Sequence, residues 1–263
     1  MRSYLAVVDA RFRSLLQYRA AAAAGFGTQL FWGLIRVMVF TGFYHSSNAR
    51  QPLSYPDAIT YLWLGQAFLA MFPWNVDNDI RALIRSGNVA YELLRPLDLY
   101  AFWFSRVLAF RTAPVILRAA PMFIVAGLLF GMKLPPSMAS FGLWIVSMLG
   151  MLALSCAITT LLTLSLIWTI SGDGVIRIAP GFVTLLSGML IPIPLMPKWA
   201  QPVLYALPFR GVCDTPFRIY TGNMPPAEAI PTIVQQFVWA VVLVALGRLA
   251  LARGLRRLEV QGG

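Results

Sequence analysis

Long apolar stretches alternate with short polar segments along most of the chain, and this pattern predicts membrane-spanning helices. A helix needs about 20 apolar residues to cross a hydrocarbon core of about 30 Å. We therefore expect an all-α integral membrane protein with a single transmembrane domain over residues 1–263. Its six predicted spans are residues 21–44, 58–74, 114–132, 138–170, 175–195 and 230–252.

Proline and polar residues set the expected limits of these spans. Pro114 is expected in the first turn of the third span, where a proline costs no hydrogen bond. The polar and semi-polar segment 75–112 before it is then the largest cytoplasmic loop. The fourth span is longer than a bilayer requires, so we expect it to tilt or to project into the cytosol.

The first 20 residues have apolar positions at helical spacing. Leu5, Val8, Phe12 and Leu15 share one face, and arginines occupy much of the remaining surface. This predicts an amphipathic helix over residues 1–20 that lies in the cytoplasmic interface of the membrane. A basic lead-in to the first span is the alternative interpretation.

The composition supports a membrane protein, because 59% hydrophobic and 12% charged residues lie outside the range of soluble domains. The arginines behind the net charge of +11 are spread over loops and helix ends, which fits membrane topology and anionic lipid and argues against nucleic acid. The predicted spans place 15 of the 21 lysines and arginines on one side and 5 on the other, with Arg36 inside the first span. Both termini are therefore expected in the cytoplasm.

The chain offers few residues for catalysis. Cys156 lies in an apolar stretch and Cys213 in a polar loop, so neither a disulfide nor a metal site is expected. His45 is the single histidine, and no paired carboxylates suggest acid–base chemistry. The two lysines, Lys133 and Lys198, lie outside any Gly-x-x-x-x-Gly-Lys-Ser/Thr phosphate loop, so this chain is not expected to bind ATP or another cofactor.

A short amphipathic helix is predicted at residues 76–86, and Gly87 can end it. It is too short to cross a membrane, so it either lies on the surface or docks on another protein. Its apolar side carries Val76, Ile80, Leu83 and Ile84, and its polar sides carry Asp77, Asp79, Arg81 and Arg85.

Six prolines between residues 191 and 222 forbid a long regular helix there, although the segment is apolar. Short helices that dip into the outer leaflet over residues 196–222 are one interpretation, since irregular backbone is tolerated where protein covers it. An ordinary structured outer loop is the other interpretation.

Several short motifs follow one another in an order that is hard to produce by chance. They are Ser86-Gly87, Leu94-Arg95-Pro96-Leu97, Ile191-Pro192-Ile193-Pro194, Leu207-Pro208-Phe209 and the terminal Gly254-Leu255-Arg256-Arg257-Leu258-Glu259-Val260-Gln261-Gly262-Gly263. In order and spacing they resemble the ABC-2 type transporter permeases and, more narrowly, a bacterial subfamily of transport-system permeases. The resemblance covers essentially the whole chain, and the terminal stretch is its most specific part.

The resemblance implies a permease subunit in the bacterial cytoplasmic membrane that moves a substrate outward. Two six-span subunits would face each other, and each would rest on a separate cytoplasmic ATPase that binds ATP and Mg²⁺. The 76–86 helix, with Gly87, is then similar to the coupling helix that docks on this ATPase. The segment between spans five and six is then a re-entrant outer gate, whose candidate residues are Pro192, Pro194, Trp199, Pro208 and Phe209.

Arg36 is the exceptional residue of the first span, because a charged side chain at such a position is costly and usually functional. Gly25, Gln29, Trp32 and Arg36 share one helix face. One hypothesis is that this stripe lines the transport pathway and that Arg36 attracts an anionic group of the substrate. Alternatively, Arg36 snorkels to outer headgroups or pairs with backbone carbonyls. Gln66 in the second span is a further pathway candidate.

Other classes of membrane protein remain as alternatives to an ABC permease. A secondary transporter would be expected to show internal repeats and more ionisable groups near the membrane midplane. A membrane enzyme would need a catalytic constellation that the sequence does not suggest. A structural membrane partner stays open, as do the substrate class and the choice between a homodimer and a heterodimer.

Overall fold

The computed structural model describes residues 2–17, 19–47, 50–168 and 173–256, and all regular structure in these ranges is helical. The terminal stretch 257–263, which carries most of the last motif, and residues 169–172 lie outside the described residues. The helices are α1 (Arg2–Leu16), α2 (Arg19–Ser46), α3 (Tyr55–Ala67), η1 (Leu69–Met71), α4 (Asn78–Arg85), α5 (Val89–Leu93), α6 (Leu99–Phe130), α7 (Met138–Trp168), α8 (Asp173–Leu186), η2 (Ile193–Leu195), α9 (Gln201–Ala206), η3 (Pro208–Val212), α10 (Asp214–Tyr220) and α11 (Pro226–Leu255).

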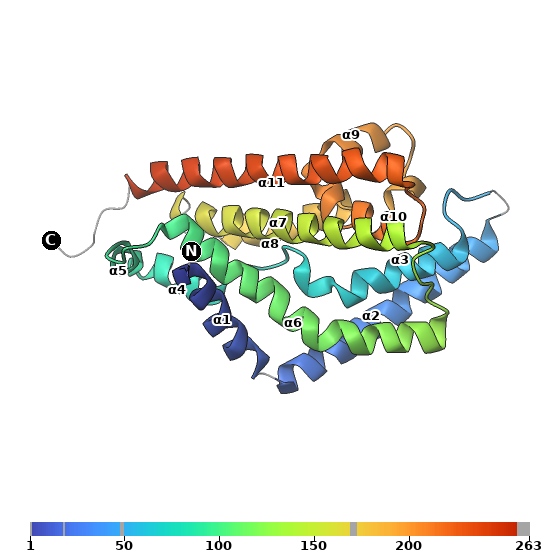
Figure 1. The fold of residues 1–263 in the computed structure, drawn as a ribbon, viewed down its shortest axis with the longest axis horizontal. Coiled ribbons are helices and arrows are strands. Elements are labelled where there is room, and N and C mark those ends of the chain that lie inside the picture. Colours follow the sequence, from blue (N-terminus) through green and yellow to red (C-terminus); the bar gives the residue numbers. More distant parts are fainter. Residues whose placement is uncertain (1, 18, 48–49, 169–172, 257–263) are drawn as a thin grey trace.

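Four helices in the described part of the chain are long and apolar enough to cross a membrane, namely α2, α6, α7 and α11. The chain is therefore a multi-pass membrane protein. Helices α7 and α11 lie side by side along the long axis of the molecule (Figure 1). Helix α7 is the central element, since it packs against α6, α8, α10 and α11.

Small residues and one glutamine hold the central helices together. A Cβ atom added at Gly150 of α7 would lie 3.1 Å from the side chain of Gln236 in α11, so the two helices meet closely there. Ser147 Oγ donates to Gln236 Oε1 at 2.9 Å, and Gln236 Nε2 donates to the carbonyl of Gly211 at 2.7 Å. Close approach at small residues and interhelical hydrogen bonds are the usual means of packing helices in lipid.

The third span starts at Leu99, 15 residues earlier than the prediction of 114–132. Asp98 caps the helix by accepting a hydrogen bond from the Ala101 amide at 2.8 Å. Pro114 and Pro121 lie inside the helix and each removes a backbone donor, which accounts for the bend of α6 in Figure 1. The connection between α3 and α6 is consequently shorter than segment 75–112 suggested.

Helices α3 and α8 are shorter than the spans predicted at 58–74 and 175–195. Helix α3 has 13 residues and α8 has 14, so each covers only about 20 Å. Helix α3 is followed by the single turn of η1. Helix α8 is followed by Gly188, whose φ of 83° is left-handed and ends the helical path. Each of the two predicted spans is therefore helical in its first part and continues as short turns and irregular backbone.

Residues 187–225 form a folded segment against one end of α7. Prolines start its short helices, with Pro202 in the first turn of α9 and Pro208 in the first turn of η3. Helix α10 and η3 both pack on α7, and Asp214 and Phe217 are fully buried. The prolines were predicted to exclude a long regular helix here, and the segment contains only short helices.

The elements sort to two ends of the molecule. Helices α1, α4 and α5 lie at the same end as the C-terminal end of α11, and we call this the α4 end (Figure 1). Helix α9 and the connection from α6 to α7 lie at the opposite end, which we call the α9 end (Figure 1). The amphipathic helix predicted at 1–20 is present as α1 and packs on α6 through Tyr4 and Val7, with Leu5 exposed.

Candidate functional site

A cavity of about 590 Å³ lies among α2, α3, η1, α6 and the C-terminal end of α8. It is lined by Thr28, Gln29, Trp32, Arg36, Gln66, Leu69, Ala70, Trp74, Asn75, Phe110, Arg111, Pro114, Arg118, Thr184, Met189 and Leu190. The cavity is thus built from the short helices α3 and α8, the backbone that follows each of them, and the long helices α2 and α6.

The four pathway candidates predicted from the sequence all line this one cavity. Gln29, Trp32 and Arg36 come from a single face of α2, as their spacing requires, and Gln66 comes from the second half of α3. Helices α2 and α3 can approach because Gly33 faces Trp63, where an added Cβ would lie 2.6 Å from the indole ring. The sequence did not single out the contributions of α6, which are Phe110, Arg111, Pro114 and Arg118.

Arg36 closes the cavity at the end of α8. Its guanidinium donates to the carbonyl of Met189 and, at 3.2 Å, to the carbonyl of Leu190. Met189 and Leu190 lie just beyond the C-terminal end of α8, where carbonyl groups are not paired by the helix and need another donor. The backbone-pairing alternative for Arg36 is therefore what the structure shows, while the side chain still borders the cavity.

Arg111 is a buried arginine whose donors are all used by the fold. Its Nη1 donates to Asn75 Oδ1 at 3.1 Å and to the carbonyl of Ala70 at 3.5 Å. Its Nε and Nη2 donate to Thr159 Oγ1 at 3.3 and 2.9 Å, and Nη2 also donates to the carbonyl of Asn75. Arg111 thereby joins α6 and α7 to the irregular backbone after α3.

Arg118 is the least satisfied of the three arginines. It makes one hydrogen bond, from Nη2 to the carbonyl of Ala21 at 3.3 Å, and its buried Nε has no partner. Its guanidinium lies directly over Gly25, where an added Cβ would be 2.3 Å from Arg118 Cζ. The first residue of the predicted α2 stripe is therefore a glycine because an arginine occupies the space of its side chain.

Two glutamine amides in the cavity also have unused hydrogen-bonding capacity. Gln29 and Gln66 are each only 2% exposed, and the Oε1 atom of each is buried without a partner. Leaving a buried acceptor unpaired costs about 1–3 kcal/mol. Such atoms mark places where a bound molecule can gain hydrogen bonds.

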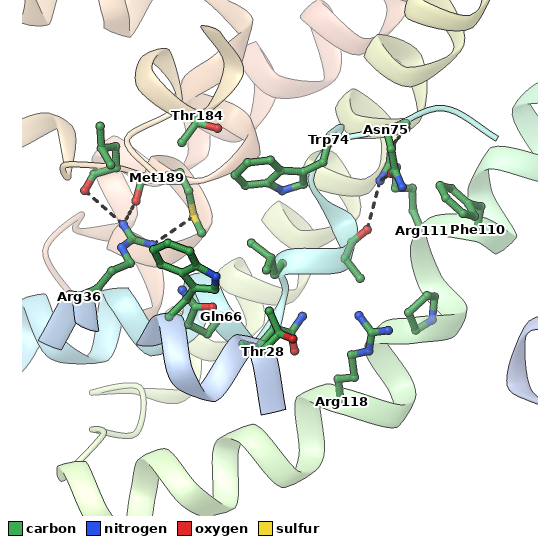
Figure 2. A pocket seen from close by; sticks show the side chains of 16 residues that line it. Thr28, Arg36, Gln66, Trp74, Asn75, Phe110, Arg111, Arg118, Thr184 and Met189 are labelled. Atoms are coloured by element: carbon green, nitrogen blue, oxygen red, sulfur yellow. Dashed lines mark hydrogen bonds between the residues drawn. The ribbon is translucent and has the colours of Figure 1, made fainter. Parts of the chain in front are cut away.

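The cavity carries three positive charges and no counter-charge from its own wall. Arg36 lies apart from Arg111 and Arg118, so the charges are spread along the cavity (Figure 2). Among the described residues that line it there is no aspartate or glutamate. An environment of this kind attracts anions, because neutral carbonyls satisfy hydrogen bonds without neutralising the charge.

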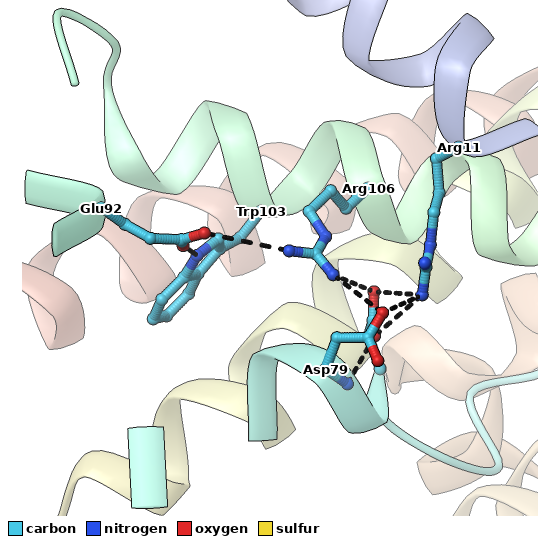
Figure 3. Close-up of polar contacts among 6 residues, drawn as sticks. Arg11, Asp79, Glu92, Trp103 and Arg106 are labelled. Carbon is cyan, nitrogen blue, oxygen red and sulfur yellow. Dashed lines mark hydrogen bonds and ion pairs between the residues drawn. The ribbon is translucent and has the colours of Figure 1, made fainter. Parts of the chain in front are cut away.

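A second polar site lies at the α4 end. Arg11 of α1 contacts Asp77 at 3.2 Å and Asp79 at 2.7 Å. Arg106 of α6 contacts the same two carboxylates at 3.2 and 3.4 Å (Figure 3). We call these four residues, together with Glu92, the charged cluster.

Glu92 extends the charged cluster to α5. Its Oε2 accepts a hydrogen bond from Trp103 Nε1 at 2.6 Å, and its Oε1 lies 3.9 Å from Arg106 Nη1. Both Glu92 and Trp103 are buried. The charged cluster therefore ties α1, α4 and α5 to the first turns of α6 (Figure 3).

The predicted coupling helix forms as α4, but its residues do not all face outward. Asp77 caps it by accepting from the Asp79 amide at 2.9 Å, and Asp77 is 1% exposed. Ile80 is fully buried in a cluster with Trp103 and Leu99.

Within this chain, Asp77 pairs with Arg106 of α6 and Ile80 packs in the cluster with Trp103, so both predicted contact residues are buried. The other predicted residues divide by exposure: Arg81, Leu83 and Ile84 are half-buried, whereas Asp79, Arg85 and Gly87 are exposed.

The exposed apolar side chains of this region belong to α5 and the residue after it. Tyr91 is 71% exposed, Leu93 47% and Leu94 80%. Leu94 stood out in the sequence only as part of a motif, so this exposed surface was not predicted. Its signal was three large apolar residues, Tyr91, Leu93 and Leu94, that lie between the predicted amphipathic helix and Arg95-Pro96.

The outer-gate candidates do not gather at one place. Pro192 and Pro208 are buried inside the folded segment, and Pro194 and Phe209 are half-buried. Trp199 is 82% exposed at the α9 end. The five residues thus hold the segment together or face outward, and none of them lines the cavity.

A comparison with protein-family models identifies the relationship that these features suggest. The model described as ABC-2 family transporter protein matches residues 30–262. The chain belongs to the ABC-2 transporter family. The matched range contains α3 to α11 and thus most of the cavity and the charged cluster, whereas α1 with Arg11 precedes it. No curated protein matches this ABC-2 transporter protein.

Membership of the ABC-2 family makes this chain a membrane transport subunit, and it favours the ABC permease over the other classes of membrane protein considered above. The family match and the four long apolar helices agree on a multi-pass transmembrane protein.

Proposed function

We propose that this ABC-2 protein is the permease subunit of a transporter that moves its substrate outward across the cytoplasmic membrane, driven by a separate cytoplasmic ATPase. The observation that carries the proposal is the α4 end. There an exposed apolar surface of Tyr91, Leu93 and Leu94 is attached to a membrane-crossing helix through a buried charged cluster.

The exposed surface of α5 has the properties of a docking site. Large apolar side chains outside a membrane are covered by a partner in most proteins, and Arg85 and Arg95 flank this patch with positive charge. The proposed occupant is the ATPase, because the family works with such a subunit. The coupling element then consists of α5 and the exposed side of α4, which shifts it a few residues beyond the helix predicted at 76–86.

Helix α6 offers a route from the docking surface to the cavity. Arg106 in its second turn is held by Asp77 and Asp79, and Arg111 and Arg118 line the cavity further along the same helix. A displacement of α4 and α5 by the ATPase would move α6 as a rigid body and shift the cavity wall. The buried contacts of Ile80 and Glu92 make α4, α5 and the start of α6 move together.

A second permease subunit, identical or homologous, completes the proposed transporter. Helix α8 has an outward face of Ile178, Phe182 and Leu185 at helical spacing, and α2 exposes Phe31, Met38 and Val39. Pairing along α2 and α8 would place the cavities of the two subunits on either side of the interface. On this reading α3 and α8 cross the membrane together with the irregular backbone that follows them, so that six segments span it and residues 196–222 form a covered outer segment.

Retention of the ATPase by a single-residue variant tests the proposal. Leu94→Asp is expected to lose at least nine-tenths of the ATPase that co-purifies with the tagged wild-type protein in mild detergent, because the charge would be buried in the docked surface. Leu134→Asp is the matched control, since Leu134 is 82% exposed but lies at the α9 end. Ile80 is unsuitable for this test, because its burial would make the variant unfold.

Mass spectrometry identifies the co-purifying chains, and an ABC ATPase must be among them. Equal retention by Leu94→Asp and wild type would contradict the docking site, and absence of any ATPase from the wild-type preparation would overturn the proposed function. A second, different permease in the sample would establish a heterodimer.

A further inference from the structure

The cavity lacks a partner for its positive charge. Three guanidinium groups border it, and none of its described lining residues is acidic. The salt bridges of the described chain involve other arginines, such as Arg11 and Arg106 at the α4 end. A ligand that occupies the cavity is therefore favoured if it brings a negative charge.

Arg118 is the residue best placed to bind that charge. The donors of Arg111 are taken by Asn75, Ala70 and Thr159, and Arg36 donates to two backbone carbonyls. Arg118 has a single hydrogen bond and a buried Nε without a partner. A planar fork with free donors binds phosphate or carboxylate oxygens in pairs.

The shape and remaining lining of the cavity indicate an amphiphile rather than a free anion. The lining residues of α2 run from Thr28 to Arg36, so the cavity follows this helix for eight residues, or about 12 Å. Trp32, Trp74 and Phe110 supply aromatic surface over this length. A small inorganic anion would leave most of this apolar surface uncovered, whereas an acyl chain would cover it.

The two glutamines add a requirement for the headgroup. The unpaired Oε1 atoms of Gln29 and Gln66 are acceptors, so they gain hydrogen bonds from hydroxyl or amine groups of a ligand. Gln66 lies between Arg36 and Arg118 in Figure 2, and Gln29 follows the lining residue Thr28 on α2.

We propose that the cavity binds an anionic amphiphile, with its acidic headgroup on Arg118 and its apolar chain along Trp32 and Phe110, and that this is the substrate class of the transporter. The second part rests on the proposed permease function. The first part concerns binding alone and holds for the isolated chain.

Competition between two short-chain lipids tests the binding. Full-length protein in an uncharged detergent is mixed with equal amounts of dihexanoyl phosphatidylglycerol and dihexanoyl phosphatidylcholine, and native mass spectrometry measures which lipid stays bound. The chains are identical, so partition into micelles affects both alike. Wild-type protein is expected to retain the phosphatidylglycerol at least tenfold over the phosphatidylcholine, because only the former is anionic.

Variants of the site distinguish Arg118 from a general attraction to basic protein. Arg118→Gln is expected to lower the preference to less than threefold, and Arg118→Lys to retain most of it. Arg13→Gln is the matched charge control, because Arg13 is exposed on α1 and away from the cavity, and it should leave the preference unchanged.

Two glycine variants test the position of the Arg118 guanidinium while the arginine itself is kept. Gly25→Ala places a methyl group 2.3 Å from Arg118 Cζ, so the guanidinium must shift, and the variant is expected to reduce the preference at least threefold. Gly27→Ala has no neighbour within 4 Å and should behave as wild type.

Three results would overturn the proposal: no preference in the wild type, an undiminished preference in Arg118→Gln, or displacement of the lipid by an equal concentration of inorganic phosphate. The last result would show a site for free anions. The assay needs no ATPase, so a chain that keeps the lipid preference but binds no ATPase would overturn the proposed function alone.

Discussion

The guanidinium groups of the cavity differ in how completely the fold satisfies their donors. Arg111 is fully used and holds η1, α6 and α7 together, whereas Arg36 closes the end of α8. Arg118 is left with spare donors next to a glycine that makes room for it. An arginine in a membrane protein therefore has to be judged by its partners, because its position in the sequence does not separate a structural role from a binding role.

Asp214 allows a test of buried charge outside the membrane-spanning helices. Burial raises the pKa of this carboxyl to about 6, although Arg218 and Arg210 oppose the shift. Since an unfolded aspartate has a pKa of about 3.9, the folded state binds more protons between about pH 4 and 6. The contribution of Asp214 to the free energy of unfolding therefore decreases as the pH rises through this window and is constant above it.

The expected result is that Asp214→Asn is more stable relative to wild type at pH 7.5 than at pH 4.5. The difference in the free energy of unfolding should change by at most about 3 kcal/mol, because two pKa units correspond to that energy. Thermal unfolding of both proteins in detergent at the two pH values measures it. The same difference at both values would contradict a raised pKa for Asp214.

The short helices at the α4 end show how an amphipathic pattern can be satisfied inside one chain. Helix α4 has the composition of a docking helix, yet its apolar residue Ile80 packs on α6 and its capping residue Asp77 pairs with two arginines. The neighbouring α5 has only five residues and exposes its apolar side chains. Helix α4 is therefore held in place by its buried contacts, whereas α5 carries the exposed apolar side chains.

Asp77→Asn tests whether the charged cluster attaches these elements to α6. The variant keeps a side chain that can cap α4 but removes the charge that compensates Arg11 and Arg106. Because Asp77 is 1% exposed, the expected loss in the free energy of unfolding is about 3 kcal/mol. Asp79→Asn touches the same arginines but is 58% exposed, so it should cost less than about 1 kcal/mol.

Denaturant unfolding of the two variants beside wild type is the measurement. Equal losses for Asp77→Asn and Asp79→Asn would mean that the charged cluster is a surface feature without a structural role.

The whole molecule combines four long apolar helices with the shorter helices α3 and α8, which irregular backbone follows. The two shorter helices and the backbone after them contribute Gln66, Thr184 and Met189 to the cavity, and the long helices contribute its arginines. Irregular backbone at membrane depth is stable only where protein covers it or where it borders a cavity. The place of the cavity thus follows from where α3 and α8 end.

The proposed arrangement of six crossings predicts which residues face each side of the membrane. Cysteine introduced at Asn88 should react with a membrane-impermeant maleimide only in inside-out vesicles, and cysteine introduced at Leu134 only in right-side-out vesicles. The native Cys156 and Cys213 are buried and should stay unlabelled. Labelling of both introduced cysteines from the same side would contradict the proposed topology.

The amino-acid sequence by itself determined the class of the protein, the long helices and the residues of the α2 stripe. Hydrophobicity and helical period are local properties, and a bilayer acts on each segment in the same way wherever it lies in the chain. The sequence therefore also predicted that Gln29, Trp32 and Arg36 share a face.

Only the tertiary structure decided where α6 begins, which side of α4 is buried, and that Arg118 lies in the cavity. Helix α6 starts at Leu99 because Asp98 caps it there. The aromatic residues in its first turns also form one cluster with residues of α1, α4 and α11, which are distant in the chain. Ile80 is buried because α4 packs against α7 and Ile80 joins a cluster with residues of α6, α7 and α11, and no local pattern distinguishes such neighbours from another protein. Contacts across such separations set which donors of an arginine are satisfied, so the binding role of Arg118 was decided by the fold.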